Sequence, residues 1–180
     1  MKTEHELAKA LKEMMSSRSL DDISVSELSK KCNVSRKTFY YHYHDIYDLL
    51  AQVFLDEKIA NLHLANNIDD LINIIWAYYQ NNSRFIDATI NSAGKDLFSE
   101  FVYNAIYTTI TKFINKIDTQ KLLSLSTKRN ITRFYAFGYS NSIVYYLASY
   151  KNRTLVGLKN CFTFMDDVDL EISVQKAIKR

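Results

Sequence analysis

Hydrogen-bond donors and positive charges are concentrated in one short segment near the N-terminus. Residues 30–44 include four basic side chains and no Asp or Glu. The basic residues are Lys30, Lys31, Arg36 and Lys37, and further donors stand at Ser35, Thr38, Tyr40, Tyr41 and His42. Short hydroxyls at a helix start suit phosphate oxygens, and Arg and Lys reach the acceptors of guanine in the major groove. The pattern favours contact with phosphates and base edges, with a solvated helix face as the alternative.

Two short helices joined by a tight turn are predicted to position these donors. Ser24 and Glu27 have the spacing of a capping box, which begins a helix over residues 24–32. Asn33 tolerates the left-handed backbone that a turn between two helices requires. Ser35 is a good N-cap for the next helix, which covers residues 35–42. This arrangement is a helix-turn-helix, whose second helix lies in the major groove of DNA.

Helices on both sides are predicted to complete a small N-terminal core. Apolar positions of a helix over residues 3–15 share one face, and a helix beginning at Asp45 has apolar residues at helical spacing from Ile46 to Phe54. Phe39 is expected to anchor the second helix of the motif in the core. Tyr43 is expected to be packed.

The composition and periodicity of the remaining chain predict an all-α fold. The sequence contains no proline and three glycines, whereas all-β folds depend on turns rich in both. Further helices are expected near residues 68–81, 83–92, 96–117, 127–151, 154–165 and 168–179. The predicted architecture is an N-terminal three-helix helix-turn-helix DNA-binding domain (1–46), followed by a helical dimerisation and regulatory domain (47–180). The helix over 127–151 is apolar on two faces, which predicts core on one side and a second subunit on the other.

Residues 23–50 resemble the helix-turn-helix of the TetR family of transcriptional regulators. The resemblance is concentrated between Val34 and Tyr43 and in the Leu49-Leu50 pair, and it extends more loosely over residues 1–55. The chain departs from the family pattern at two places. Cys32-Asn33 stands where the family usually has Ala-Gly, and Ile46 stands where it usually has Lys.

The resemblance implies a repressor that binds a palindromic operator as a homodimer and is released by an unknown small molecule. The expected DNA contacts are Ser24, Ser35, Arg36, Lys37, Thr38, Tyr40, Tyr41 and His42. Aromatic side chains that could line an effector pocket are Trp76, Tyr79, Tyr103, Tyr107 and Tyr139, with ordinary core packing as the alternative. The expected dimer interface consists of Phe137, Val144, Leu147, Leu155, Leu158, Phe162 and Met165.

A second hypothesis is a protein of the same fold that acts as a co-activator through a protein partner. It is kept open by Ile46 and by the balanced charge of the first fifty residues, eight Lys or Arg against eight Asp or Glu. No phosphate loop, nucleophile elbow or ligand cluster supports an enzyme, and no cofactor or metal is expected. Cys32 and Cys161 lack ligand spacing, so reduced thiols are expected. Without a signal peptide or a long apolar run, the chain is expected in the cytoplasm and not in a membrane.

Overall fold

The computed structural model describes residues 2–179, and the described chain is helical without strands. The prediction of an all-α fold is confirmed. None of the described helices is both long enough and apolar enough to cross a membrane. The elements in chain order are α1 (Lys2–Met15), the 3-10 turn η1 (Leu20–Asp22), α2 (Val25–Lys31), α3 (Arg36–His42), α4 (Ile46–Asp56), the 3-10 turn η2 (Leu62–Leu64), α5 (Ile68–Asn81), α6 (Ser83–Ile90), α7 (Lys95–Ile117), α8 (Leu125–Ser149), α9 (Leu155–Asn160) and α10 (Asp167–Ile178).

The chain forms two compact units that do not coincide with the expected division after residue 46. The first unit contains the chain up to Lys58 together with Asn81–Phe101, and the second contains Ile59–Gln80 and the chain from Val102 onward. All of α4 therefore belongs to the first unit. The Phe54 ring of α4 lies 5.6 Å from Phe85 and 5.3 Å from Phe101, centre to centre. The end of the DNA-binding part at residue 46 stays a prediction about function.

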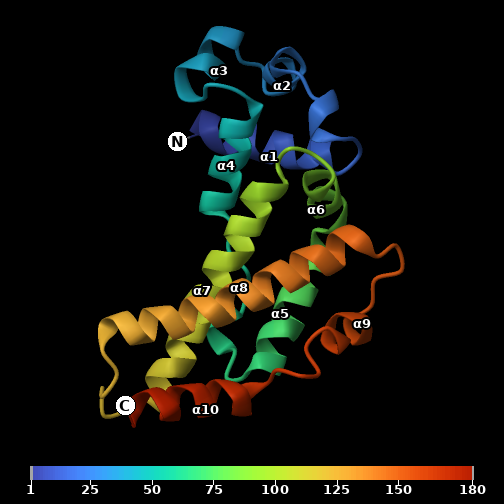
Figure 1. Cartoon of the computed structure of the whole chain (residues 1–180). Helices are drawn as coiled ribbons and strands as arrows, with labels where there is room; N and C mark the ends of the chain where they lie inside the picture. The colour runs from blue at the N-terminus through green and yellow to red at the C-terminus, as the bar shows by residue number, and fades with distance from the viewer. Residues whose placement is uncertain (1, 180) are drawn as a thin grey trace. The chain divides into compact units, whose positions relative to one another are not determined.

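The helix-turn-helix forms as its local sequence predicts (Figure 1). The Ser24 hydroxyl accepts a hydrogen bond from the Glu27 amide, and the Glu27 carboxylate accepts one from the Ser24 amide, which completes the capping box. Asn33 has a φ of 53°, so it adopts the left-handed conformation expected at the turn. The Ser35 hydroxyl then caps α3 by accepting from the Thr38 amide at 3.0 Å.

The core of the first unit holds α3 through one ring. Phe39 is fully buried, as are Leu28 of α2 and Leu49 of α4. Tyr43 at the end of α3 is 7% exposed, and its ring centre lies 5.8 Å from that of Phe39. The predictions that Phe39 anchors α3 and that Tyr43 is packed are confirmed. Burying a ring of this size removes a large apolar area from water, which is the main force that can hold so short a helix.

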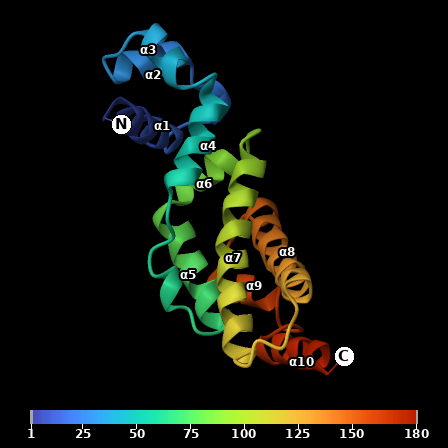
Figure 2. The same ribbon diagram turned by 90° about the vertical axis from the view of Figure 1, so that its left-hand side faces the viewer.

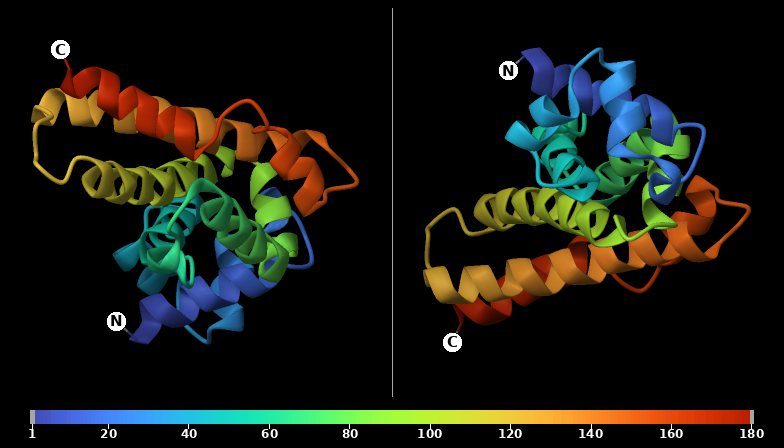
Figure 3. Two further views of the ribbon diagram at one scale, coloured as in Figure 1. Left: turned by 90° about the horizontal axis from the view of Figure 1, so that it is seen from below. Right: turned by 90° about the horizontal axis from the view of Figure 1, so that it is seen from above.

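The second unit is a layered helical body. Figure 2 shows α5 on one side of α7 and α8 on the other, and in both views of Figure 3 α10 lies along α8. The Tyr135 hydroxyl of α8 is 2.9 Å from the Ser173 hydroxyl of α10, and this hydrogen bond joins the two helices. Lys112 of α7 donates to the carbonyl of Ala65 at 2.7 Å, which holds the chain before α5 against α7.

In the second unit α8 has the expected length but lies two residues earlier in the chain, at 125–149 instead of 127–151, and one other helix is shorter than expected. α8 begins at Leu125 because the Ser124 hydroxyl accepts from the Thr127 amide, and it ends where Tyr150 becomes extended. The expected helix over 154–165 is much shorter, since α9 ends at Asn160. The three-to-four-residue spacing of Leu158, Phe162 and Met165 continues past that end. Apolar spacing alone did not reveal where the helix stops.

We predict that Phe39→Ala lowers the free energy of unfolding by about 3–5 kcal/mol, because it leaves a cavity beneath α3. Urea unfolding followed by circular dichroism measures the change. Tyr41→Ala is the matched control, since Tyr41 is 84% exposed two residues away and its loss should change stability by less than about 0.5 kcal/mol. Equal losses for the two variants would contradict the anchoring role of Phe39.

Candidate nucleic-acid interface

The exposed side of α3 carries basic and aromatic side chains that the sequence predicts to contact DNA. Arg36 and Lys37 are exposed in its first turn, and Tyr40 and Tyr41 are 51% and 84% exposed. The Arg36 guanidinium lies 5.9 Å from the centre of the Tyr40 ring, within the range of a cation–π contact. Among the described residues Lys37 forms no ion pair. These four side chains are available to a ligand outside the protein.

Two hydroxyls at the start of α3 are held in place by each other. The Ser35 and Thr38 oxygens are 2.8 Å apart, and the Ser35 hydroxyl also accepts from the Thr38 amide. Ser35 is exposed and Thr38 is half-buried. Because the hydroxyls are oriented before any ligand arrives, a contact to a phosphate oxygen at this helix start would cost little further ordering.

Ser24 is a predicted DNA contact whose hydroxyl is already fully used in capping α2. Its hydroxyl donates to the Glu27 carboxylate at 2.9 Å while accepting from the Glu27 amide. The Ser24 amide, the Ser24 hydroxyl and Arg18 together lower the pKa of Glu27 to about 2. A permanent negative charge beside Ser24 disfavours the approach of phosphate. Its DNA contact stays a prediction, and α3 holds the better-placed donors.

His42 is the last of the predicted DNA contacts, and its side chain connects α3 to α1. Its Nδ1 atom is 3.3 Å from the Glu4 carboxylate, and its ring packs edge-on against Tyr41 with centres 5.1 Å apart. His42 is only 21% exposed, so much of its ring is covered by the protein. The contact to Glu4 joins residues 38 positions apart in sequence, and no local pattern could have indicated it.

The start of α4 lacks the lysine that the TetR pattern usually has there. Ile46 is 8% exposed and packs into the core, so this position contributes no phosphate contact through its side chain. The neighbouring Tyr47 is 38% exposed, and its hydroxyl donates to Asp21 at 2.7 Å. That hydrogen bond raises the pKa of Tyr47, with burial adding to the effect. Sequence reasoning missed Tyr47, although its place beside the Asp45 cap could have indicated an exposed donor.

The five aromatic residues expected to bind an effector fall into three separate clusters in the second unit. Trp76 and Tyr79 of α5 are 5.2 Å apart between ring centres, and the Tyr79 hydroxyl accepts from Arg153. Tyr103 and Tyr107 of α7 form a second pair at 5.8 Å. Tyr139 is fully buried and donates to the Met165 carbonyl. Each cluster has packing partners of its own, and the effector site stays a prediction.

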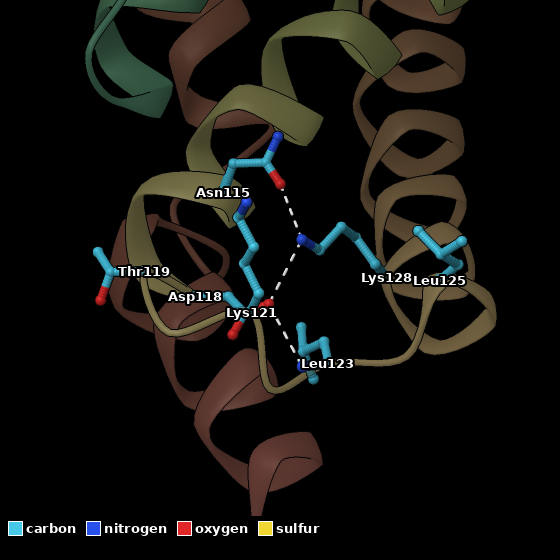
Figure 4. Close-up of a pocket in the computed structure, with 7 residues that line it drawn as sticks. All are labelled: Asn115, Asp118, Thr119, Lys121, Leu123, Leu125 and Lys128. Atoms are coloured by element: carbon cyan, nitrogen blue, oxygen red, sulfur yellow. Dashed lines mark hydrogen bonds and ion pairs between the residues drawn. The ribbon is translucent and has the colours of Figure 1, made fainter.

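A cavity of about 570 Å³ lies at the turn between α7 and α8, and none of these aromatic residues lines it (Figure 4). Lys128 bridges the Asp118 carboxylate at 3.3 Å and the Asn115 amide oxygen at 2.8 Å. Asp118 is 2% exposed and also accepts from the amides of Leu122 and Leu123. Burial alone would raise the pKa of Asp118, but these hydrogen bonds and Lys128 outweigh it and lower that pKa. The bonds among Asp118, Lys128 and Asn115 hold the turn.

Most residues of the expected dimer interface are buried within the chain, and the interface itself stays a prediction. Val144, Leu147, Leu158 and Phe162 are each at most 6% exposed, and Leu155 and Met165 are half-buried. Of the seven, only Phe137 is exposed, at 53%. α8 is apolar on two faces, as predicted, but its inner face takes Val144 and Leu147. The large apolar side chains that α8 exposes are Leu125, Phe134, Phe137 and Tyr145.

Two family models match most of the chain between them. The model "Bacterial regulatory proteins, tetR family" matches residues 7–53, and the model "Transcriptional regulator C-terminal region" of the same family matches residues 66–154. The solved structure described as "Dihydroxyacetone kinase operon activator DhaS" has the same fold, with a TM-score of 0.59 and 22% sequence identity. That likeness covers 98% of this chain and 96% of the other. No curated protein sequence matches the chain.

We predict that Asn33→Ala destabilises the protein by about 1–2 kcal/mol, because a Cβ without a compensating polar group is disfavoured at positive φ. Asn33→Gly should be neutral or slightly stabilising, since glycine adopts this conformation without steric strain. Thermal unfolding of both variants measures the difference. If Asn33→Ala is as stable as Asn33→Gly, the left-handed conformation at residue 33 does not limit the stability of the helix-turn-helix.

We predict that Asp118→Asn lowers the melting temperature at pH 7, because Lys128 loses the carboxylate it pairs with. A carboxyl group whose pKa is lowered by folding contributes stability above its unfolded pKa and loses it as the pH falls through the folded value. The deficit of the variant should therefore shrink below about pH 4. Melting curves from pH 3 to 7 measure this convergence, and a deficit that is independent of pH would contradict the role of the charge.

Proposed function

Because the chain belongs to the TetR family of bacterial transcriptional regulators, we propose that it binds a palindromic operator as a homodimer, with α3 in the major groove. The observation that carries the proposal is the outer side of α3. Arg36 and Lys37 are exposed in its first turn, Tyr41 is 84% exposed in its last turn, and the buried Phe39 holds the opposite side in the core. A helix presented in this way can enter a groove without rearranging the protein.

The side chains of α3 divide into two kinds of DNA contact. Arg36 and Lys37 have the length and charge to reach guanine O6 and N7, which would specify sequence. Ser35, Thr38, Tyr40 and Tyr41 offer hydroxyls suited to phosphate oxygens, which would fix the register of the helix on the duplex. The contact of Arg36 with the Tyr40 ring restrains the guanidinium before binding, so less entropy is lost on contact.

A homodimer is supported by the exposed side of α8. Phe134 and Tyr145 are 65% and 67% exposed, and large apolar groups gathered on one helix face mark an interaction surface. A two-fold dimer would present two copies of α3, and their spacing would set the separation of the operator half-sites. A regulator that binds operator DNA in a bacterium acts in the cytoplasm, where we place this chain.

A homodimer that binds DNA through α3 can repress transcription without another protein, because occupying a promoter requires DNA binding alone. The relative of known structure is named an activator, and at 22% identity it shares the fold with this chain. Release of the operator by a small molecule, which the family resemblance implies, stays part of the proposal, although the aromatic residues expected to bind that molecule lie in three separate clusters.

The second candidate function is co-activation through a protein partner. It is favoured by the buried Ile46 and by donors of the motif that are already engaged, such as Ser24 with Glu27 and His42 with Glu4. Because these side chains are buried or already bonded within the protein, fewer of them can contact phosphate than the family pattern would provide. A chain that co-purifies with one protein and binds no DNA fragment would favour this function over the first.

The proposal is tested by selecting genomic fragments with the purified protein and footprinting the enriched sequence. Lys37→Ala and Tyr41→Ala should each weaken operator binding by about 1–3 kcal/mol, which is about 5- to 150-fold. If Lys37 contacts a phosphate, its removal also reduces the slope of log affinity against log salt by about 1. Lys95→Ala is the control, because it removes the same charge from an exposed position at the start of α7. Unchanged affinity in the Lys37 and Tyr41 variants would overturn the assignment of α3.

A further inference from the structure

The cavity at the turn between α7 and α8 carries an excess of positive charge. Its polar lining consists of Asn115, Asp118, Thr119, Lys121 and Lys128, and its apolar lining of Leu123 and Leu125 (Figure 4). Two lysines therefore accompany a single carboxylate. The chain around the cavity is basic as well, because residues 101–165 contain nine Lys or Arg and one acidic residue, Asp118. The cavity is suited to an anion.

The buried Asp118 carboxylate does not neutralise both lysines. One of its oxygens accepts from the Leu122 amide at 2.8 Å. The other accepts from the Leu123 amide at 3.3 Å and lies 3.3 Å from the Lys128 ammonium group. Among the described residues, the exposed Lys121 side chain has no ion pair or hydrogen bond. The positive charge of Lys121 is therefore left for a ligand.

Lys128 is held in place before any ligand arrives. Its side chain is 19% exposed, and its ammonium group donates to the Asn115 amide oxygen at 2.8 Å while pairing with Asp118. An ammonium group has three donors, so one donor of Lys128 remains for a further acceptor. Because the two existing partners already order this side chain, little entropy would be lost when it binds an anion.

Lys121 is positioned by an uncommon backbone conformation. Its φ of 55° lies in the left-handed region, which residues other than glycine seldom adopt. Asp118 holds this conformation, because its carbonyl accepts from the Lys121 amide at 3.1 Å and its carboxylate accepts from the next two amides. Figure 4 shows the Lys121 side chain extending from the turn toward Asn115, whose amide oxygen Lys128 also reaches. Backbone conformations of this kind cluster at ligand sites.

We propose that this cavity binds the carboxylate of a small molecule with an apolar tail. Lys121 and the remaining donor of Lys128 would hold the carboxylate, and Leu123 and Leu125 would contact the tail. A single negative charge matches the one uncompensated lysine, whereas a phosphate dianion would exceed it. The cavity volume of about 570 Å³ lies within the range of about 300–1,000 Å³ that is common for small-molecule sites.

In the proposed function such a molecule would be the effector that releases the operator, and this role rests on that function. One helix connects the cavity with the first unit along the chain. α7 begins at Lys95, in the first unit, and ends at Ile117, the residue before Asp118. A ligand that shifts the end of α7 acts on a rigid element, which can carry the change along its length.

Titration calorimetry of the full chain without DNA tests the site, with hexanoate as the probe. The unaltered chain should bind hexanoate and not hexanol, which has the tail without the charge. Lys121→Gln should weaken hexanoate binding about 3- to 10-fold, because it removes the ammonium group and retains the length of the side chain. Lys151→Gln is the control, since it removes the same charge from an exposed position beyond the other end of α8. No binding of hexanoate, or equal binding by the two variants, would overturn the proposal.

The contact with the tail is tested by comparing hexanoate with acetate. Because each buried CH₂ group adds to affinity, hexanoate should bind at least about tenfold more tightly. Leu125→Ser should remove most of this difference without unfolding the chain, since Leu125 is 82% exposed. Leu122→Ser is the control, because Leu122 is 58% exposed in the same turn and does not line the cavity. Equal affinities of the unaltered chain for hexanoate and acetate, or tighter binding of inorganic phosphate, would contradict a carboxylate with an apolar tail.

A third measurement separates this site from the proposed function. Saturating hexanoate should weaken binding of the selected operator by the unaltered chain at least about fivefold, measured by fluorescence anisotropy, and should have less effect on Lys121→Gln at the same concentration. Hexanoate that binds the cavity and leaves operator affinity unchanged would rule out the effector role. A chain that binds hexanoate but no DNA fragment would overturn the proposed function and leave the carboxylate site standing.

Discussion

The burial of Phe39 is the interaction on which the candidate interface depends. α3 has seven residues, and an isolated helix of that length is not stable in water. Its start is fixed by the Ser35 cap and by the turn at Asn33, but a cap sets where a helix begins and not which way it faces. The ring of Phe39, in the core with Leu28 and Leu49, determines the rotation of α3 about its axis. Arg36, Lys37 and Tyr41 point outward because Phe39 points inward.

The parts of this interface that the sequence predicted are those governed by near neighbours. The capping box of Ser24 and Glu27, the left-handed Asn33 and the buried Tyr43 follow from residues only a few positions apart. Contacts between distant parts of the chain could not be predicted in this way. The approach of Glu4 to His42 depends on how α1 packs against the end of α3, which no local pattern encodes.

In the second unit, most differences between the sequence-based predictions and the structure have one physical cause. α8 is apolar around much of its circumference, so periodicity indicates two buried faces without saying which lies inside its own chain. Val144 and Leu147 occupy the inner face, whereas Phe134 and Tyr145 remain outside. The surplus of aromatic residues is ambiguous for the same reason. A tyrosine ring such as that of Tyr139 packs in a core as well as it would line a pocket, and only the packing of helices decides between them.

The capping box at the start of α2 affects how the protein responds to low pH. With its pKa at about 2, Glu27 stays ionised long after ordinary carboxyl groups have taken up protons. The bonds that bind it to Ser24 and Arg18 therefore persist through mild acidification. The stability that Glu27 contributes is present above its pKa in the unfolded chain and is lost as the pH falls toward its lower pKa in the folded chain. In the folded chain the cap of α2 should therefore stay formed in mild acid, although the free energy that it contributes to folding already declines there.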